Sequence, residues 1–184
     1  IVAVVVLTLL LSLALFVSQA ATIEWANAGS DWATGGNWVG GTAPVNGTGT
    51  DIASFGSTGA SPVNPNLGAA RSVNGVSFLS GAYAYTVSGS TLTIGTGGIT
   101  DSATNIETFS NQINTSTSET WTSNGGSTLV LNGTVDLATT ASSSRTLTLN
   151  GSGDATFGGV IQNSGSSSTG SLTYSGTGTL TLNN

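Results

Sequence analysis

A short cassette recurs through the second half of this chain, and it constrains the fold more than any single residue does. Each copy has an apolar residue, a β-branched or polar residue and a second apolar residue, and it closes on small polar residues or glycine. The copies are Leu92-Thr93-Ile94-Gly95, Leu129-Val130-Leu131-Asn132-Gly133, Leu147-Thr148-Leu149-Asn150-Gly151, Leu172-Thr173-Tyr174-Ser175-Gly176 and Leu180-Thr181-Leu182-Asn183-Asn184. Three alternating residues cannot form a core alone, so we expect the copies to stack on one another as a β-solenoid.

Further short segments with strand character lie around and between the cassettes. They are Val76–Leu79, Tyr85–Val87, Ile106–Ile113, Thr134–Leu137 and Ala155–Ile161. No stretch after residue 21 combines a helical period with capping residues, so we expect an all-β structure. In it, inward Leu, Ile and Val alternate with outward Thr, Ser and Asn. With coils of roughly 20 to 25 residues stacked about 4.8 Å apart, residues 72–184 would hold about five coils.

The chain carries very little charge. Charged residues make up 5% of it, whereas a soluble domain has about a quarter. The only cations are Arg71 and Arg145, and the net charge is -6. This balance argues against binding to nucleic acid or to anionic lipid surfaces. Intrinsic disorder is an alternative for so polar a chain, but the apolar alternation and the four tryptophans argue against it.

The residue types needed for most catalytic and metal sites are absent. The chain has no Cys and no His, which excludes disulfides, thiolate metal sites and the commonest general base. A Ser nucleophile would therefore have neither a His nor a Lys beside it. The acids fall singly, each in a different coil or turn by our assignment: Glu24, Asp31, Asp51, Asp101, Glu107, Glu119, Asp136 and Asp154.

Two glycine-rich turns resemble ligand loops but lack the partners that such loops need. Gly151-Ser152-Gly153-Asp154 has the form of a calcium-binding repeat turn, yet it occurs once, and neighbouring copies must share the ion. Gly95-Thr96-Gly97-Gly98 is followed by neither a helix nor a Lys, as a phosphate loop requires. We therefore expect no catalytic, cofactor-binding or metal-binding residues, and no enzymatic activity.

The first 20 residues form an apolar segment. Ile1–Val17 is interrupted only by Thr8 and Ser12, and small residues precede a possible cleavage point after Ala20. This pattern is typical of a helical signal peptide. The alternative is retention of the segment, as in a pilin-like filament subunit that buries an apolar helix in the fibre. Because the chain begins without Met and stops just after a cassette, we expect it to be truncated at both ends.

Residues 21–71 differ from the repeats that follow. They contain three of the four tryptophans, Trp25, Trp32 and Trp38, all three prolines and many glycines. A solenoid needs a terminal cap that covers its first coil, and we expect this irregular region to be that cap. The alternative is that the tryptophans form a platform on which sugars stack.

Several of these segments resemble proteins with autotransporter-associated β-strand repeats. The pattern W-x6-W-x3-GNW-x-GG-x-AP, which starts at Trp25, resembles the beginning of such proteins. The segment Gly170–Leu182 resembles the repeat itself, with Tyr174 where the family usually has Lys. The resemblance covers about residues 22–184. It implies a right-handed parallel β-helix passenger that is secreted by a Gram-negative bacterium and displayed or released at the cell surface.

We therefore expect a secreted or surface-displayed structural or adhesive passenger that is non-catalytic and has no cofactor. Its partners would be surface or matrix glycans, or further copies of itself, but not nucleic acid. It would contact a membrane only through residues 1–20 or a translocator elsewhere. The alternatives are the pilin-like filament subunit and a carbohydrate-binding or carbohydrate-active β-helix.

Overall fold

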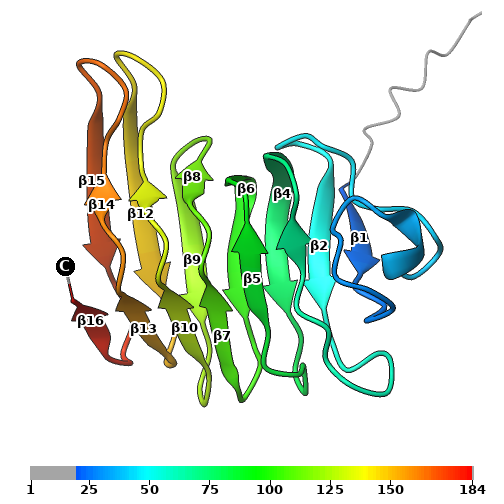
Figure 1. Cartoon of the computed structure of the whole chain (residues 1–184). Helices are drawn as coiled ribbons and strands as arrows, with labels where there is room; N and C mark the ends of the chain where they lie inside the picture. The colour runs from blue at the N-terminus through cyan, green and yellow to red at the C-terminus, as the bar shows by residue number, and fades with distance from the viewer. Residues whose placement is uncertain (1–19, 184) are drawn as a thin grey trace, which may run out of the picture.

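The computed structural model describes residues 20–183 and consists almost wholly of β-strands (Figure 1). The strands are β1 (Ala21–Glu24), β2 (Asp51–Phe55), β3 (Asn66–Leu67), β4 (Arg71–Phe78), β5 (Thr86–Gly89), β6 (Leu92–Asp101), β7 (Ile106–Phe109), β8 (Ile113–Thr115), β9 (Glu119–Ser123), β10 (Thr128–Leu131), β11 (Val135–Asp136), β12 (Ser144–Asn150), β13 (Asp154–Phe157), β14 (Ile161–Gln162), β15 (Thr169–Tyr174) and β16 (Leu180–Leu182). One short 3-10 helix, η1 (Gly35–Asn37), lies between β1 and β2. The predicted all-β class is confirmed.

The strands form two parallel sheets that wind as a β-solenoid of about six turns. The first sheet runs in the order β1-β2-β4-β6-β8-β11-β14, with β9, β12 and β15 joined to it. The second runs in the order β3-β5-β7-β10-β13-β16. Each coil from β2 onward therefore contributes to both sheets, and every pairing between named strands joins a coil to its neighbour. The predicted parallel solenoid is confirmed.

A ladder of inward residues in the second sheet shows how the coils stay in register. Val87, Phe109, Leu131, Phe157 and Leu182 are successive register partners. The first four are buried, whereas Leu182 in the last coil is 52% exposed. Apolar contact between coils thus complements the backbone hydrogen bonds along the stack.

The cassettes have the predicted alternation but not the predicted stacking. Leu147 and Leu149 are buried while Thr148 between them is only half-buried. Leu147 pairs directly with Leu172, but the Leu129 and Leu180 cassettes lie in the other sheet, in β10 and β16. The expectation that all copies stack on one another is therefore wrong. Both sheets of a coil need an apolar-x-apolar strand, which explains the irregular spacing of the copies.

Coil length varies because loops are inserted on one side of the solenoid. The register partners Phe109 and Leu131 are 22 residues apart, whereas Trp121 and Leu149 are 28 apart. The longer coil carries the loop between β11 and β12, which projects beyond the other coils beside a similar loop before β15 (Figure 1).

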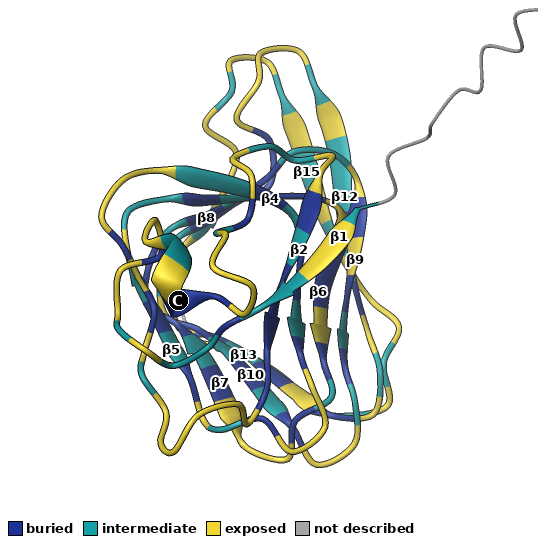
Figure 2. Ribbon diagram, turned by 90° about the vertical axis from the view of Figure 1, so that its right-hand side faces the viewer, coloured by how far each residue is buried: buried dark blue, intermediate teal, exposed yellow. Residues whose placement is uncertain are grey.

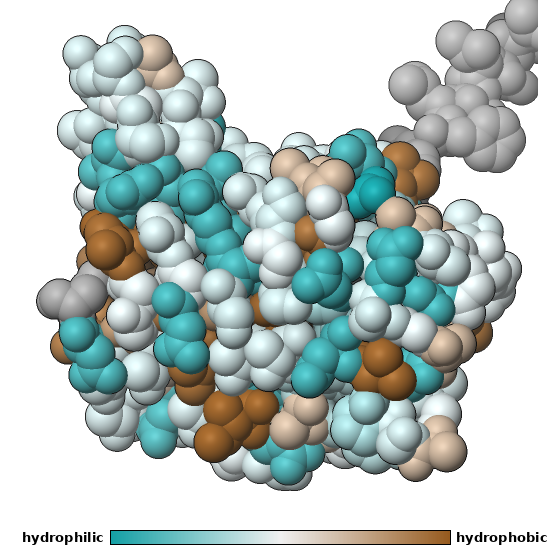
Figure 3. All heavy atoms as spheres, in the orientation of Figure 1, coloured by the Kyte–Doolittle hydropathy of each residue, from teal (hydrophilic) through white to brown (hydrophobic). Residues whose placement is uncertain are grey.

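The burial pattern follows the two sheets. Side chains inside the coil are buried, and exposure is concentrated on loops and outward strand positions (Figure 2). Seen from the side, the outer surface is mostly hydrophilic or neutral, with small separate apolar patches (Figure 3). Hydroxyl and amide side chains thus provide the hydrogen bonds to water on a surface that has few charges.

Residues 21–71 contribute strands to the solenoid as well as irregular structure. β1 pairs with β2, and β2 pairs with β4, so the parallel ladder begins before residue 72. The predicted apolar signal segment, residues 1–20, lies outside the described residues except for Ala20. Within residues 20–183, no helix is long and apolar enough to cross a membrane.

Candidate functional site

The three N-terminal tryptophans form a buried aromatic cluster. Trp25, Trp32 and Trp38 are each at most 1% exposed. The Trp38 ring meets those of Trp25 and Trp32 edge-on, at centroid distances of 4.8 and 4.9 Å, and all three lie near Phe55. A sugar-stacking platform needs an exposed ring face, which these side chains do not offer. The cluster packs instead against Phe55 of β2, in the interior at the N-terminal end of the described residues.

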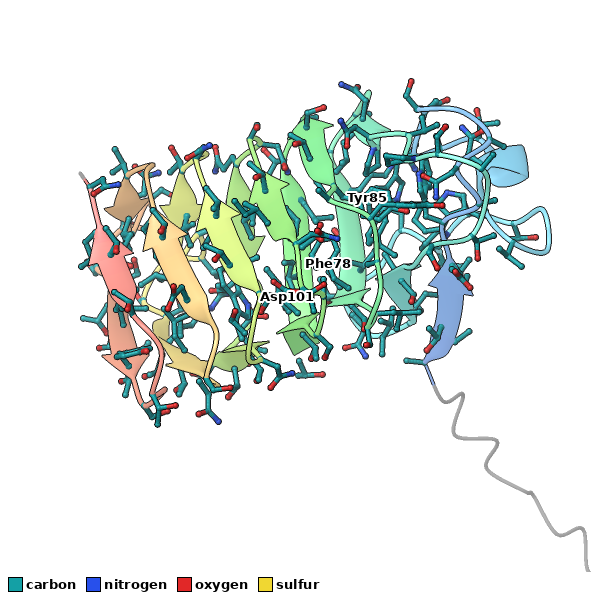
Figure 4. The ribbon with its side chains drawn as sticks, turned by 90° about the horizontal axis from the view of Figure 1, so that it is seen from below. Phe78, Tyr85 and Asp101 are labelled. Atoms are coloured by element: carbon teal, nitrogen blue, oxygen red, sulfur yellow. The ribbon has the colours of Figure 1, made fainter. Side chains whose placement is uncertain are left out.

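Carboxyl groups inside the solenoid are the most unusual chemical feature of the described residues. Asp101 ends β6, Glu107 lies in β7, and both are 0% exposed. Asp101 is the register partner of Phe78. Glu107 pairs with Leu129 on one side and stands beside Tyr85 on the other, since Thr86 pairs with Thr108. Figure 4 shows Phe78, Tyr85 and Asp101 close together in the interior.

Each of these two carboxyls has one bonded and one free oxygen. The backbone N–H of Ala103 donates to Asp101 Oδ1 at 3.0 Å, and that of Tyr85 donates to Glu107 Oε2 at 2.8 Å. Asp101 Oδ2 and Glu107 Oε1 are buried and have no hydrogen-bond partner in the structure. Buried polar atoms are normally paired, so the two free oxygens call for an explanation.

The interior raises the proton affinity of both groups. Burial raises the pKa of Asp101 to about 6, against the opposing effects of the Ala103 N–H and of the nearby Ser127 hydroxyl. Burial likewise raises the pKa of Glu107 to about 8, and the negative charge of Asp101 adds to this effect. Asp101 and Glu107 therefore influence each other electrostatically inside the solenoid.

Glu119 is a third buried acid, in the following coil. It begins β9, pairs with Leu147 and is 6% exposed, and neither carboxyl oxygen has a hydrogen-bond partner. Burial raises the pKa of Glu119 to about 8, while Trp121 and Arg145 oppose the shift. The Arg145 guanidinium donates instead to the Thr115 carbonyl and to the Thr140 hydroxyl.

Asp136 shows that burial alone does not raise the pKa of a carboxyl group in this solenoid. It is 0% exposed, and burial acts to raise its pKa, but hydrogen bonds from Ser164, Gln162 and Ala138 outweigh that effect and lower it. Its two oxygens accept N–H groups of those three residues at 3.0 to 3.2 Å. Asp136 is thus a satisfied structural carboxylate, unlike Asp101 and Glu107.

The first of the two glycine-rich segments follows the end of β12, and the second lies inside a strand. Gly151 has a positive φ of 102°, and exposed Asp154 accepts the Thr179 N–H at 2.7 Å. Gly95–Gly98 lies within β6 rather than before a helix. Among residues 20–183, no three His, Cys, Asp or Glu side chains lie together as a metal site would require, and no pocket is found.

Sequence reasoning missed the internal carboxyls. It placed each acid in a different coil or turn, but Asp101 and Glu107 belong to one coil, on either side of the corner between β6 and β7. It also expected inward Ile, whereas Ile106 is 57% exposed and Glu107 beside it is buried. The available signal was the alignment of Glu107 with Tyr85 and Leu129 in the two flanking coils. Both coils place a large side chain at this position, which indicates that the position is buried.

Comparison of the chain with known protein families, curated proteins and solved structures found no match.

Proposed function

We propose that this chain is a structural, non-catalytic β-solenoid, displayed or released at a bacterial cell surface as part of an autotransporter-type passenger. The observation that carries the proposal is the parallel ladder that continues from β1 to β15 in one sheet and from β3 to β16 in the other. Such a ladder joins each coil only to its neighbours, so it makes an extended body that holds an attached region away from its anchor.

The chemistry of the chain supports a physical role. The interior is filled by large side chains, among them Phe55, Phe78, Phe109 and Phe157, all 0% exposed. The outer face is mostly hydroxyl, amide and glycine, with few charges. The resemblance of Gly170–Leu182 to autotransporter-associated repeats points to the same role and to export across the outer membrane.

The proposed partners are glycans of a surface or matrix, or further copies of the solenoid. Hydroxyl and amide groups on outward strand positions suit hydrogen bonding to sugars, and exposed strand edges suit pairing between copies. The low number of cations in the sequence, Arg71 and Arg145 alone, supports partners other than nucleic acid.

The test is to recover the protein from its native source and to determine its location, intact mass and N-terminal sequence. A surface-exposed or released protein that starts at Ala21 is the expected result. A start at or before Ile1 with assembly into fibres would replace the proposal with the filament subunit. Retention inside the cell would contradict surface display.

Adhesion and catalysis need a separate measurement on the purified chain. We expect cells or beads coated with it to attach to glycan-coated surfaces or to one another, without cleavage of the glycan. Turnover of a polysaccharide, abolished by substitution of a single acid, would overturn the non-catalytic role.

A further inference from the structure

We infer that Asp101 and Glu107 form a proton-binding pair inside the solenoid, and that release of the bound proton loosens the coil that carries them. This inference rests on the fold and on the two side chains alone. It is independent of the proposed surface role, and its failure would leave that role untouched.

The first step is that the two carboxyls occupy interior positions that align with two neighbouring aromatic rings. In the preceding coil, the equivalent positions hold Phe78 and Tyr85, whose ring centroids are 6.5 Å apart. Asp101 and Glu107 stand one coil further along the same two ladders. In the coil of Asp101 and Glu107, two smaller side chains therefore stand where the preceding coil has two aromatic rings.

The second step is that the hydrogen bonds leave two oxygens for one ligand. Asp101 Oδ1 and Glu107 Oε2 are each taken by a backbone N–H, while Asp101 Oδ2 and Glu107 Oε1 have no partner. A proton bound at a free oxygen removes the negative charge of that carboxyl, which burial makes costly.

The third step is that the surroundings offer no positive charge. The flanking coils present Phe78 and Tyr85 on one side, and Ser123, Ser127 and Leu129 on the other. The Tyr85 hydroxyl is already bonded, to Gly56 and Asn27. The Ser127 and Ser123 hydroxyls are 2.8 Å apart and bond to each other.

The two arginines stand elsewhere. Arg71 pairs with Leu92, at the opposite end of β6 from Asp101. Arg145 in β12 is held by Thr115 and Thr140. Two buried, unpaired negative charges cost many kcal/mol, so the folded coil requires a bound proton.

The consequence is a loss of stability with rising pH. The folded pair holds a proton that the unfolded chain releases, so folding is favoured in acid and is weakened as the pair deprotonates. The proton leaves to solvent, and both carboxylates then remain inside the coil. The solenoid should open first at this coil, because contacts between coils are only nearest-neighbour.

The experiment is thermal unfolding of the whole chain between about pH 5 and about pH 9, in a Glu119→Gln background that removes the third buried acid. We expect the midpoint of the background protein to fall by at least about 5 °C over this range. Glu107→Gln, which keeps the acceptor oxygen and stays neutral, should reduce the fall, and the part that remains belongs to Asp101. Asp154→Asn, at an exposed acid that also accepts one N–H, is the matched control and should not change it.

An unchanged pH dependence in Glu107→Gln would overturn the inference. If that variant does not fold, the infrared band of a protonated carboxyl in the background protein at neutral pH decides the question, and its absence overturns the inference. Calcium provides the last check. A midpoint raised by calcium chloride and lowered by a chelator, with both effects lost in Glu107→Gln, would show that the free oxygens bind a cation instead.

Discussion

Phe78 and Asp101 are register partners in neighbouring strands, so an aromatic ring and a carboxyl occupy the same inward position of two successive coils. Both side chains are 0% exposed. The Phe78 ring stacks on Phe55 at 5.3 Å and meets Phe109 edge-on at 5.8 Å. Phe78 thus packs between rings of the preceding and the following coil and lies directly beside buried Asp101 in the parallel ladder.

Truncation of this ring should therefore affect both stability and the neighbouring acid. We expect Phe78→Ala to lower the free energy of unfolding by about 3–5 kcal/mol and to admit water beside Asp101. Hydration would bring the pKa of Asp101 down from about 6 toward its ordinary value, so less stability would be lost as pH rises. The destabilisation measured by urea unfolding should be smaller at about pH 7 than at about pH 5. Phe78→Leu, which fills most of the space, is the control, and an equal loss at both pH values would contradict the coupling.

Leu149 tests the inward assignment of the cassettes. It is 2% exposed and lies in register between Trp121 and Tyr174. Leu149→Asp would place a charge without a partner in the interior, and we expect it to cost at least about 3–5 kcal/mol and to unfold its own coil and the adjacent ones. Thr148→Asp, on the outward side of the same strand, should melt close to the unsubstituted protein. Equal melting of the two variants would show that the inward assignment is wrong.

The alternation around Leu149 shows what sequence can predict here. An apolar-x-apolar triplet identifies a strand and its buried face from local residues alone. Which sheet the triplet joins depends on the coil length, and loops such as that between β11 and β12 change it. Ile106 and Glu107 show what the local pattern does not predict. Pairing with the neighbouring coils sets which of the two side chains points inward, and this overrides their hydrophobicity.

The buried acids could not be found from spacing for the same reason. Asp101 and Glu107 are six residues apart, a spacing that does not bring two side chains together in a single strand or helix. Both side chains enter the interior because the chain turns a corner between them, and the corner follows from the stacking of whole coils. The tryptophan-rich segment, by contrast, was evident from composition, which left open whether its rings are buried or exposed.

Glu119 should make stability depend on pH in its own right. Burial raises its pKa from 4.5 to about 8, so the folded state binds the proton more tightly than the unfolded chain. Its contribution is fully present below pH 4.5 and is lost as pH rises through about 8. Glu119→Gln is neutral throughout, so we expect it to melt higher than the unsubstituted protein at about pH 9 and at a similar temperature at about pH 5. Glu24→Gln, at a half-buried acid of β1, is the control, and a Glu119→Gln difference that does not vary with pH would refute the assignment.

Trp38 should stabilise the N-terminal end of the solenoid. Its ring contacts both other tryptophans of the cap, and its indole N–H donates to the Trp32 carbonyl at 2.8 Å. We expect Trp38→Ala to cost about 3–5 kcal/mol and to raise hydrogen exchange in β1, β2 and β4 much more than in β12 and β15. Val39→Ala, at the next residue and 50% exposed, should leave exchange unchanged. Uniform acceleration along the whole chain would instead indicate one cooperative unit, without nearest-neighbour behaviour.

Gly151 tests how closely the coils approach one another at the end of β12. Its φ is 102°, and a Cβ added there would lie 1.9 Å from the backbone carbonyl oxygen of Ser123 in the adjacent coil. Because that oxygen belongs to the backbone, it cannot move aside without breaking the register. We expect Gly151→Ala to lower the free energy of unfolding by about 2 kcal/mol or more. Gly49→Ala, where an added Cβ meets nothing within 4 Å, should be neutral or slightly stabilising, and thermal unfolding of the two variants side by side measures the difference. Equal midpoints would mean that the coils can separate at this turn without loss, which contradicts a continuous ladder between Ser123 and Gly151.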